Sequence, residues 1–173
     1  MGRDDVTRLA LMMASAATLA SPAFAEKIFV SNEKGNTITV LDGTSQEIIH
    51  TITGLQRPRG ITASPDGKVI YVCSSDDNLV RVFDAATYEE LPNLPSGPDP
   101  ELFVLHPTGN PLYIANEDDN IVTVVDVTTR QVLAEVPVGV EPEGMGVSPD
   151  GRIVVNTSET TNMAHLDRKS TRL

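Results

Sequence analysis

The chain has 173 residues, of which 40% are hydrophobic and 21% are charged, a composition typical of one globular domain and unlike that of a disordered chain. Its formal net charge is −11 at pH 7, which argues against nucleic acid and anionic lipid as partners, because an acidic surface repels their phosphates. The acidity is uneven: residues 26–165 carry 21 acidic and 8 basic side chains, whereas the last eight residues carry one acidic and three basic.

The first 25 residues have the layout of a secretory signal peptide. Leu9–Ala20 is an uncharged, mostly apolar run of 12 residues, too short for the roughly 20 residues that span a bilayer. The small-x-small triplet Ala23–Ala25 follows, and signal peptidases accept such triplets. We therefore expect cleavage after Ala25, a periplasmic mature chain and no membrane span in it. The alternative is a buried apolar helix, because Asp4 and Asp5 offset the usual positive charge of a signal peptide.

A repeat of 42 residues organises the rest of the chain. Residues recur at this interval in several sets: Asn36, Asn78, Asn120 and Asn162; Asp42, Asp84 and Asp126; Pro58, Pro100 and Pro142; Pro65, Pro107 and Pro149; Gly67, Gly109 and Gly151. Independent sets in one register are very unlikely by chance, and a constant period of this length indicates one repeated structural unit. The repeats cover about residues 26–67, 68–109, 110–151 and 152–165.

Each repeat resolves into four short apolar runs separated by turn residues. In the second repeat, Gly60–Ala63 precedes a Ser-Pro-Asp-Gly turn with proline, aspartate and glycine in favoured roles. The runs Lys68–Cys73 and Leu79–Phe83 follow, and an irregular run with proline lies around residues 87–94. Because proline is tolerated at a sheet edge, this fourth run is the predicted outer strand. Its counterpart in the third repeat is residues 131–138.

Four strands in 40–45 residues without helical periodicity are the mark of a β-propeller blade. The sequence therefore predicts an all-β chain, a β-propeller of four-stranded antiparallel blades that is incomplete, with two full blades and two partial ones. On this assignment Lys27–Ser31 is the second strand of a blade whose inner strand is missing. Since so few blades cannot close a ring, the end sheets would expose apolar flanks, and we expect poor stability or self-association.

The end of the chain departs from the repeat. Asp167 stands at a position that is apolar in the earlier repeats, and Arg168 stands at one that is aspartate in them. We therefore expect the propeller to end near residue 165 and residues 166–173 to form a non-repeat tail. This tail is either a truncation artefact or a natural basic extension.

The repeat resembles the YVTN-type β-propeller family. The tetrapeptide that names this family has counterparts at Phe29–Asn32, Tyr71–Ser74 and Tyr113–Asn116, and the Ser-Pro-Asp-Gly turns at 64–67 and 148–151 also match. The resemblance covers about residues 26–165. It implies a closed ring, typically of seven blades.

A narrower resemblance concerns the bacterial β-propeller protein associated with pyrroloquinoline-quinone-dependent catabolism. The matching segments are Ser31–Asn36, Arg57–Gly60, Ser96–Leu102, Ala115–Asn120 and Asn156–His165. This resemblance implies a periplasmic protein that works beside quinoprotein alcohol oxidation, with a quinoprotein dehydrogenase or its electron acceptor as its partner. It supplies no chemical role by itself, because propellers host many functions.

Charged side chains stand at equivalent positions in the loops that enter the inner strands of successive blades. They are Arg57, Arg59, Asp99, Glu101, Glu141 and Glu143. Loops that enter the inner strands lie around the channel of a propeller, and loops carry function more often than the scaffold does. We therefore predict a ring at the channel mouth that binds a ligand or partner. The alternative is a set of solvated charges.

Acidic turn residues on the same face are additional candidates for a metal site: Glu117, Asp118, Asp119 and Glu159. Carboxylate oxygens suit Ca²⁺ or another divalent cation, and a negative field would also attract a cationic partner. The alternative is again simple solvation. No Cys-x-x-Cys-His sequence is present, which excludes covalent haem, and no other cofactor is evident.

Cysteine and histidine provide no catalytic motif. Cys73 is the single cysteine, so no intramolecular disulfide forms, and we interpret it as a small buried apolar residue. His50 and His106 have no catalytic partner at motif spacing. His165 lies on a predicted strand, where it either points into the channel or serves the structure.

Three functions remain open from the sequence. The first is a non-enzymatic periplasmic binding or accessory protein that uses the charged mouth and is linked to quinoprotein alcohol catabolism. The second is a hydrolase, because propeller lactonases have a related repeat and use acidic channel residues, sometimes with a divalent metal. The third is a cell-surface adhesion module.

Overall fold

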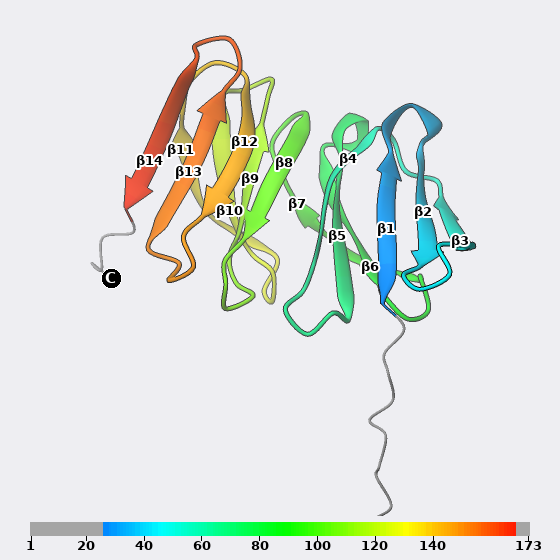
Figure 1. Ribbon diagram of the computed structural model, residues 1–173. Helices are drawn as coiled ribbons and strands as arrows, with labels where there is room; N and C mark the ends of the chain where they lie inside the picture. Colours follow the sequence, from blue (N-terminus) through cyan, green and yellow to red (C-terminus); the bar gives the residue numbers. More distant parts are fainter. Residues whose placement is uncertain (1–25, 169–173) are drawn as a thin grey trace, which may run out of the picture.

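The computed structural model describes residues 26–168, which form four antiparallel sheets (Figure 1). The first sheet holds β1 (Lys27–Asn32), β2 (Thr37–Asp42) and β3 (Ile48–Thr53). The second holds β4 (Pro58–Ala63), β5 (Val69–Ser74), β6 (Leu79–Asp84) and β7 (Glu90–Pro95). The third holds β8 (Pro100–Leu105), β9 (Leu112–Asn116), β10 (Ile121–Asp126) and β11 (Gln131–Pro137). The fourth holds β12 (Pro142–Val147), β13 (Ile153–Ser158) and β14 (Met163–Arg168).

Two short 3₁₀ helices connect strands of the first two sheets: η1 (Glu33–Gly35) joins β1 to β2, and η2 (Ser75–Asp77) joins β5 to β6. Among the described residues, no helix is long and apolar enough to cross a membrane. The predicted signal peptide at 1–25 and the last five residues of the predicted tail lie outside the described part of the chain.

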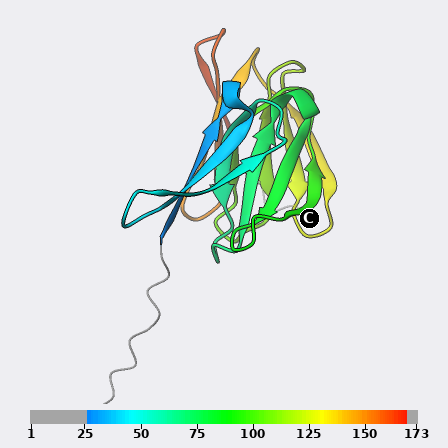
Figure 2. The same cartoon turned by 90° about the vertical axis from the view of Figure 1, so that its right-hand side faces the viewer.

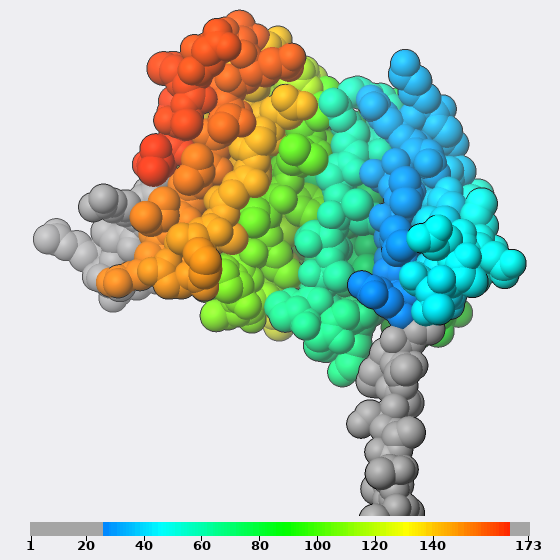
Figure 3. Space-filling view, in the orientation of Figure 1, coloured from blue at the N-terminus to red at the C-terminus, as the bar shows by residue number. Residues whose placement is uncertain are grey.

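The predicted all-β architecture of two full and two partial blades is confirmed. The four sheets stand side by side in chain order, and each inner strand lies beside the next, β4 against β8 and β8 against β12 (Figure 1). Figure 2 views this row from its first sheet, in blue and cyan. Figure 3 shows the blades in contact as successive bands of colour. Within residues 26–168, the first sheet has no equivalent of β4, and the last has no equivalent of β7 and β11.

Strand limits agree with the sequence pattern to within about two residues in the second blade. β4 begins at Pro58, two residues before the predicted run, and the outer strand β7 covers Glu90–Pro95. β14 continues through Arg168, so the backbone keeps the blade geometry for three residues beyond residue 165. The origin of the tail stays a prediction.

Apolar layers between the sheets hold the blades together. Because successive residues of a strand point to opposite faces, β5 serves two layers. Ile70 and Val72 pack into the layer shared with the first sheet, whereas Tyr71 and Cys73 pack into the layer shared with the third. Cys73 is fully buried, as predicted, and burial raises the pKa of its thiol well above the ordinary value.

The end sheets leave apolar side chains exposed. Ile28 and Val30 on β1 are 42% and 41% exposed, and Met163 and Leu166 on β14 are 50% and 67% exposed. The face of β1 that carries Ile28 and Val30 has no neighbouring blade among the described residues. On β14, by contrast, Met163 shares the face that carries His165, and Leu166 borders the space beside the third sheet. Self-association of the chain through its end sheets stays a prediction.

The repeated aspartates close the turn before each outer strand. One oxygen of Asp42 accepts hydrogen bonds from the backbone N–H groups of Thr44 and Ser45, at 2.9 and 2.8 Å. Asp84 and Asp126 make the same pair of bonds in the next two blades. These backbone hydrogen bonds lower the pKa of each of the three carboxyl groups. Aspartate therefore recurs every 42 residues because the same turn recurs, and in each turn the carboxylate accepts hydrogen bonds from two otherwise free backbone N–H groups.

The repeated asparagines join each blade to the next, an arrangement we call the asparagine latch. Asn36, Asn78 and Asn120 adopt left-handed backbone conformations, which asparagine tolerates better than most residues. Their Oδ1 atoms accept hydrogen bonds from the backbone N–H groups of Arg57, Asp99 and Glu141, at 2.9, 3.0 and 3.0 Å. The latch residue of one blade thus fixes the chain where it enters the inner strand of the next.

Removing a latch should destabilise the chain more than removing an unlatched asparagine. Asn162 has the same left-handed backbone, but its side chain makes no hydrogen bond among the described residues, so Asn162→Ala measures the backbone cost alone. We expect Asn78→Ala to lower the free energy of unfolding by about 1–3 kcal/mol more than Asn162→Ala does, because it leaves the N–H of Asp99 unpaired. Urea unfolding of both variants tests this. Equal losses would show that the latch contributes nothing.

Candidate functional site

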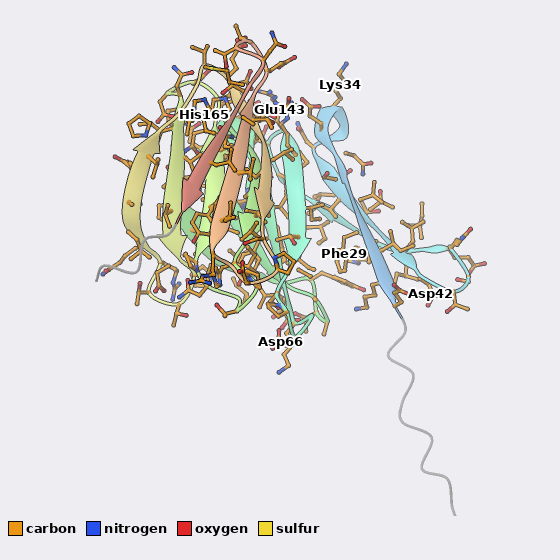
Figure 4. The ribbon with its side chains drawn as sticks, turned by 60° about the vertical axis from the view of Figure 1, so that its left-hand side comes forward. Phe29, Lys34, Asp42, Asp66, Glu143 and His165 are labelled. Carbon is orange, nitrogen blue, oxygen red and sulfur yellow. The ribbon has the colours of Figure 1, made fainter. Side chains whose placement is uncertain are left out.

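The loops that carry the latches, together with the starts of the inner strands, form one end of the molecule. We call the charged side chains gathered there the charged rim: Glu33, Arg57, Arg59, Asp76, Asp99, Glu101 and Glu117. Figure 4 labels Lys34, beside Glu33, and Glu143 at this end, with Asp42 and Asp66 toward the other. The rim therefore lies at the end of the molecule where the inner strands begin, and a channel mouth at this end stays a prediction.

Arg57 joins three blades at the rim. Its Nη1 lies 3.1 Å from Oδ1 of Asp76 and 3.5 Å from Oδ1 of Asp99, and its Nε lies 3.6 Å from Oε1 of Glu33. Burial lowers the pKa of the Arg57 guanidinium, but the hydrogen bond to Asp76 and the charges of Asp99, Asp76 and Glu33 outweigh that effect and raise it. Arg57 therefore stays charged, with 37% of its side chain exposed.

Arg59 and Glu101 form the buried part of the rim. Nη1 of Arg59 pairs with Oε1 of Glu101, whose side chain is only 2% exposed, and lies 3.7 Å from Oε2 of Glu117. A carboxylate buried this deeply needs a cation or hydrogen-bond donors, because burial of an unpaired charge is very costly. Arg59 is the cation that meets this need.

The repeat itself explains which residues meet. Arg57 and Asp99 are 42 residues apart, as are Arg59 and Glu101, so each pair occupies equivalent positions on adjacent inner strands. The close approach of these strands needs Gly60, because a Cβ there would lie 2.9 Å from the backbone oxygen of Glu101. An arginine in one blade therefore faces an acid in the next.

The backbone that presents these charges is unusual. Arg57, Asp99 and Glu141 all have positive φ, at 48°, 46° and 54°, a region that non-glycine residues rarely adopt. The latch holds their N–H groups, and their carbonyl groups accept hydrogen bonds from the N–H groups of residues 75, 117 and 159, at 3.1, 3.0 and 3.0 Å. Such over-determined strained positions concentrate at functional sites.

Three rim carboxylates are arranged as ligands for a cation. One oxygen from each of Asp99, Glu101 and Glu117 lies within 4.8 Å of the other two. Oxygen atoms that share one Ca²⁺ lie up to about 5 Å apart, since each bond is about 2.4 Å, so the three residues fit a hard divalent cation. Arg59 contacts two of the same carboxylates, and a cation and Arg59 would compete for them.

The structure brings together part of the predicted site. Of the six ring residues, Arg57, Arg59, Asp99 and Glu101 are in direct contact through ion pairs. Glu141 and Glu143 are partly buried, and no arginine or lysine of the described chain forms an ion pair with them. Of the four metal candidates, Glu117 belongs to the carboxylate group. The other three, Asp118, Asp119 and Glu159, do not.

The sequence interpretation treated ring and metal residues as separate sets and missed their combination. It also missed Asp76 and Glu33 as partners of Arg57. The spacing could have revealed the central pairs, because opposite charges 42 residues apart face each other across adjacent blades. The contribution of Glu117 has no such signal, since it comes from a different loop.

The histidines take no part in the rim. His106 accepts a hydrogen bond from the backbone N–H of Thr108, at 3.2 Å, within its turn. His50 stacks on Tyr88 with ring centres 4.4 Å apart. His165 lies on β14 and lines a pocket between the third and fourth sheets.

Comparison with family models gives one decisive match. Residues 29–143 match the family described as "Lactonase, 7-bladed beta-propeller", and this range contains every residue of the charged rim. The chain belongs to this lactonase family. The β-propeller family predicted from the repeat is thereby confirmed, whereas the link to quinone-dependent catabolism stays a proposal. None of the curated proteins compared with this lactonase-family chain matches it.

A solved structure shares the fold of this lactonase-family propeller. It is the Kuenenia stuttgartiensis hydrazine synthase, at 23% sequence identity and a TM-score of 0.76, with 82% of the present chain aligned. The chain spans 42% of the length of that protein. Similarity at this level supports the propeller fold and carries no information on activity.

Asp119 differs from its equivalent in the preceding blade. Asp77 pairs with Arg81 at 3.0 Å, but Thr123 replaces that arginine in the third blade. Oδ1 of Asp119 is buried and makes no hydrogen bond within residues 26–168. Burial raises the pKa of the Asp119 carboxyl above its ordinary value, although backbone hydrogen bonds at Ile121 and at Asp119 itself oppose the shift.

Asp119→Asn should therefore stabilise the chain at neutral pH. A carboxyl whose pKa is raised in the folded state destabilises folding once the pH exceeds its unfolded value of about 3.9. The advantage of the variant should be largest near pH 7 and should disappear at about pH 3. Urea midpoints across this range test the prediction, with Glu47→Gln, an exposed change in another blade, as control. A less stable Asp119→Asn at pH 7 would contradict it.

Proposed function

We propose that the chain forms the reacting face of a lactone hydrolase, with the charged rim as its active site. The observation that carries this proposal is the carboxylate of Glu101, which is 2% exposed, paired with Arg59 and grouped with Asp99 and Glu117. Membership of the lactonase family supports it. Buried carboxylates beside fixed cations are common at active sites and uncommon elsewhere on protein surfaces.

Hydrolysis of a lactone needs a base and a positive charge. A water oxygen bonds to the carbonyl carbon, the ring C–O bond breaks, and the product is an open hydroxy acid. A base must accept a proton from the attacking water and return it to the ring oxygen as the C–O bond breaks, and the negative charge that develops on the carbonyl oxygen must be stabilised in place. The rim offers carboxylates for the first task and guanidinium groups for the second.

The individual roles follow from exposure. Glu117, 29% exposed and beside Arg59, is placed to accept the proton from water. Arg59 is placed to stabilise the developing oxyanion. Arg57, the more exposed arginine, suits the carboxylate of the product, because guanidinium and carboxylate groups form strong charge-assisted hydrogen bonds.

A divalent cation fits the same site. In this second arrangement Asp99, Glu101 and Glu117 would hold the cation, which would polarise the lactone carbonyl as a Lewis acid in place of Arg59. Glu117 would then act as a ligand and not as the base. The five carboxylates and two guanidinium groups of the rim leave three negative charges, so the site has an excess of charge for a cation to neutralise.

Replacing Glu101 should abolish most of the activity. We expect the purified chain to hydrolyse simple five- and six-membered lactones, followed by proton release in a pH-stat. Glu101→Gln should lower kcat/KM by a factor of about 10² or more, because Arg59 and the carboxylate group lose their fixed geometry. Glu47→Gln, an exposed change away from the rim, is the control. Hydrolysis that is unaffected by Glu101→Gln would exclude the rim as the active site.

Calcium binding should respond in opposite directions to two rim variants. Arg59→Gln removes the group that competes for Glu101 and Glu117, so it should bind Ca²⁺ about tenfold or more tightly than the unaltered chain. Glu101→Gln removes a ligand and should bind Ca²⁺ more weakly. Calorimetric titration measures both. Weaker binding by Arg59→Gln would show that the arginine supports the cation site.

A second candidate is the accessory role in quinoprotein alcohol catabolism, in the periplasm and without catalysis. The negative surplus of the rim and the net charge of −11 favour it, because such a field attracts a cationic partner protein. Binding to a quinoprotein dehydrogenase, or to its electron acceptor, that weakens steeply between 50 and 500 mM salt, in about the manner of screened charges, would support this role. Lactone hydrolysis that depends on Glu101 would favour the first candidate.

A further inference from the structure

The layers between successive sheets are built from equivalent residues, and the third layer is built from smaller ones. Val136 stands where the first and second layers have Ile52 and Leu94. Val154 stands where they have Ile70 and Leu112. The space between the third and fourth sheets is therefore filled less completely than the space in either preceding layer.

A pocket of about 250 Å³ occupies this layer. Its walls are mostly apolar and include Val122, Val124, Val136, Met145 and Val154. The two substitutions to valine contribute to the pocket, because each removes a methylene from a position that is filled elsewhere in the molecule. If nothing entered this space, the atoms that line it would lose dispersion contacts, and the layer would be less stable.

A polar residue also replaces an apolar one in this layer. Asn156 stands at the position of Val72 and Ile114, which are fully buried in the preceding layers. Asn156 is 3% exposed and lines the pocket. Its Nδ2 donates to the backbone oxygen of Gly144 at 3.2 Å. Its Oδ1 is buried and has no hydrogen-bond donor among the described residues.

His165 lies directly beside Asn156. The two residues are cross-strand partners in the β13–β14 register, so their side chains share one face of the sheet. His165, labelled in Figure 4, also lines the pocket. Its Nε2 is buried without a hydrogen-bond partner in the part of the chain described. Two buried polar atoms on one wall therefore have no hydrogen-bond partner in the described chain, although buried polar groups ordinarily have one.

We propose that this pocket binds a small, mostly apolar molecule that carries one hydroxyl group. A hydroxyl donates one hydrogen bond and accepts others, so its proton can go to Oδ1 of Asn156 while its oxygen accepts the Nε2–H of His165. The walls cover the rest of the molecule. An apolar cavity of about 150 Å³ is large enough for benzene, and the present pocket is larger, so a ring of six atoms with a hydroxyl fits.

Phenol and toluene form a matched pair of probes, because they differ by a hydroxyl in place of a methyl group. The methyl resonance of Met145, in the wall of the pocket, reports binding, and Met163, 50% exposed and outside the pocket wall, is the internal control. We expect a saturable shift of Met145 alone, with phenol bound about tenfold or more tightly than toluene. No saturable shift with either probe, or equal affinities, would overturn the proposal and leave water as the partner of Asn156.

Two variants test the same geometry from the protein side. Asn156→Val restores the residue type of Val72 and should remove the preference for phenol while the pocket still admits toluene. Val136→Leu with Val154→Leu restores Leu94 and Leu112 of the second layer and should weaken the binding of both probes, because it narrows the pocket. Val132→Leu, the same addition at a 45% exposed position of β11, should bind phenol as the unaltered chain does.

The variants also guard against loss of folding. The filled variant should unfold at a higher temperature than the unaltered chain, because it packs the layer, and the unaltered chain should gain Tm as phenol is added. Unchanged phenol binding in the filled variant, or an unchanged preference in Asn156→Val, would show that the pocket is not the site.

Discussion

Each sheet of this chain is held by the next one. An apolar layer lies between them, and an asparagine side chain accepts a hydrogen bond from the backbone of the neighbouring blade. The hydrogen bond from Asn78 Oδ1 to the N–H of Asp99 is one of three such latches. A single sheet could not bury both of its faces, so the fold depends on covering each sheet with another. The latch fixes the position of one blade relative to the next, because it determines the residue at which the chain enters each inner strand. Everything at the charged rim follows from that fixed entry point.

The rim shows how a repeated scaffold produces a unique site. The same backbone position carries arginine in one blade and an acid in the next, so Arg59 and Glu101 meet because their blades are neighbours. Strained φ angles at Arg57 and Asp99 are tolerated because the latch and the following loop hold both sides of the peptide. A rigid scaffold of this kind can keep opposite charges, and a buried carboxylate among them, in fixed geometry. Such preorganisation is what hydrolytic chemistry needs.

The pocket between the third and fourth sheets comes from the same principle applied inside the molecule. Equivalent positions that hold leucine, isoleucine or valine in two layers hold valine or asparagine in the third. Because the backbone repeats, a smaller side chain leaves a space where its equivalents leave none. Changes on repeated positions thus create a charged surface site at the rim and a mostly apolar site within a layer, without altering the fold.

The period of 42 residues, the Ser-Pro-Asp-Gly turns and the alternating runs by themselves determined the blades, their strand order and the end of the molecule that holds the charges. Local chemistry suffices for these features, since turns and strand faces depend on residues close in sequence. Only the tertiary structure decided that Glu117 joins Asp99 and Glu101 while Asp118 and Asp119 do not. It likewise decided that Asn156 faces its neighbouring sheet beside His165. Both outcomes depend on how far one blade stands from the next and on which way each side chain turns, and packing between distant segments sets those quantities.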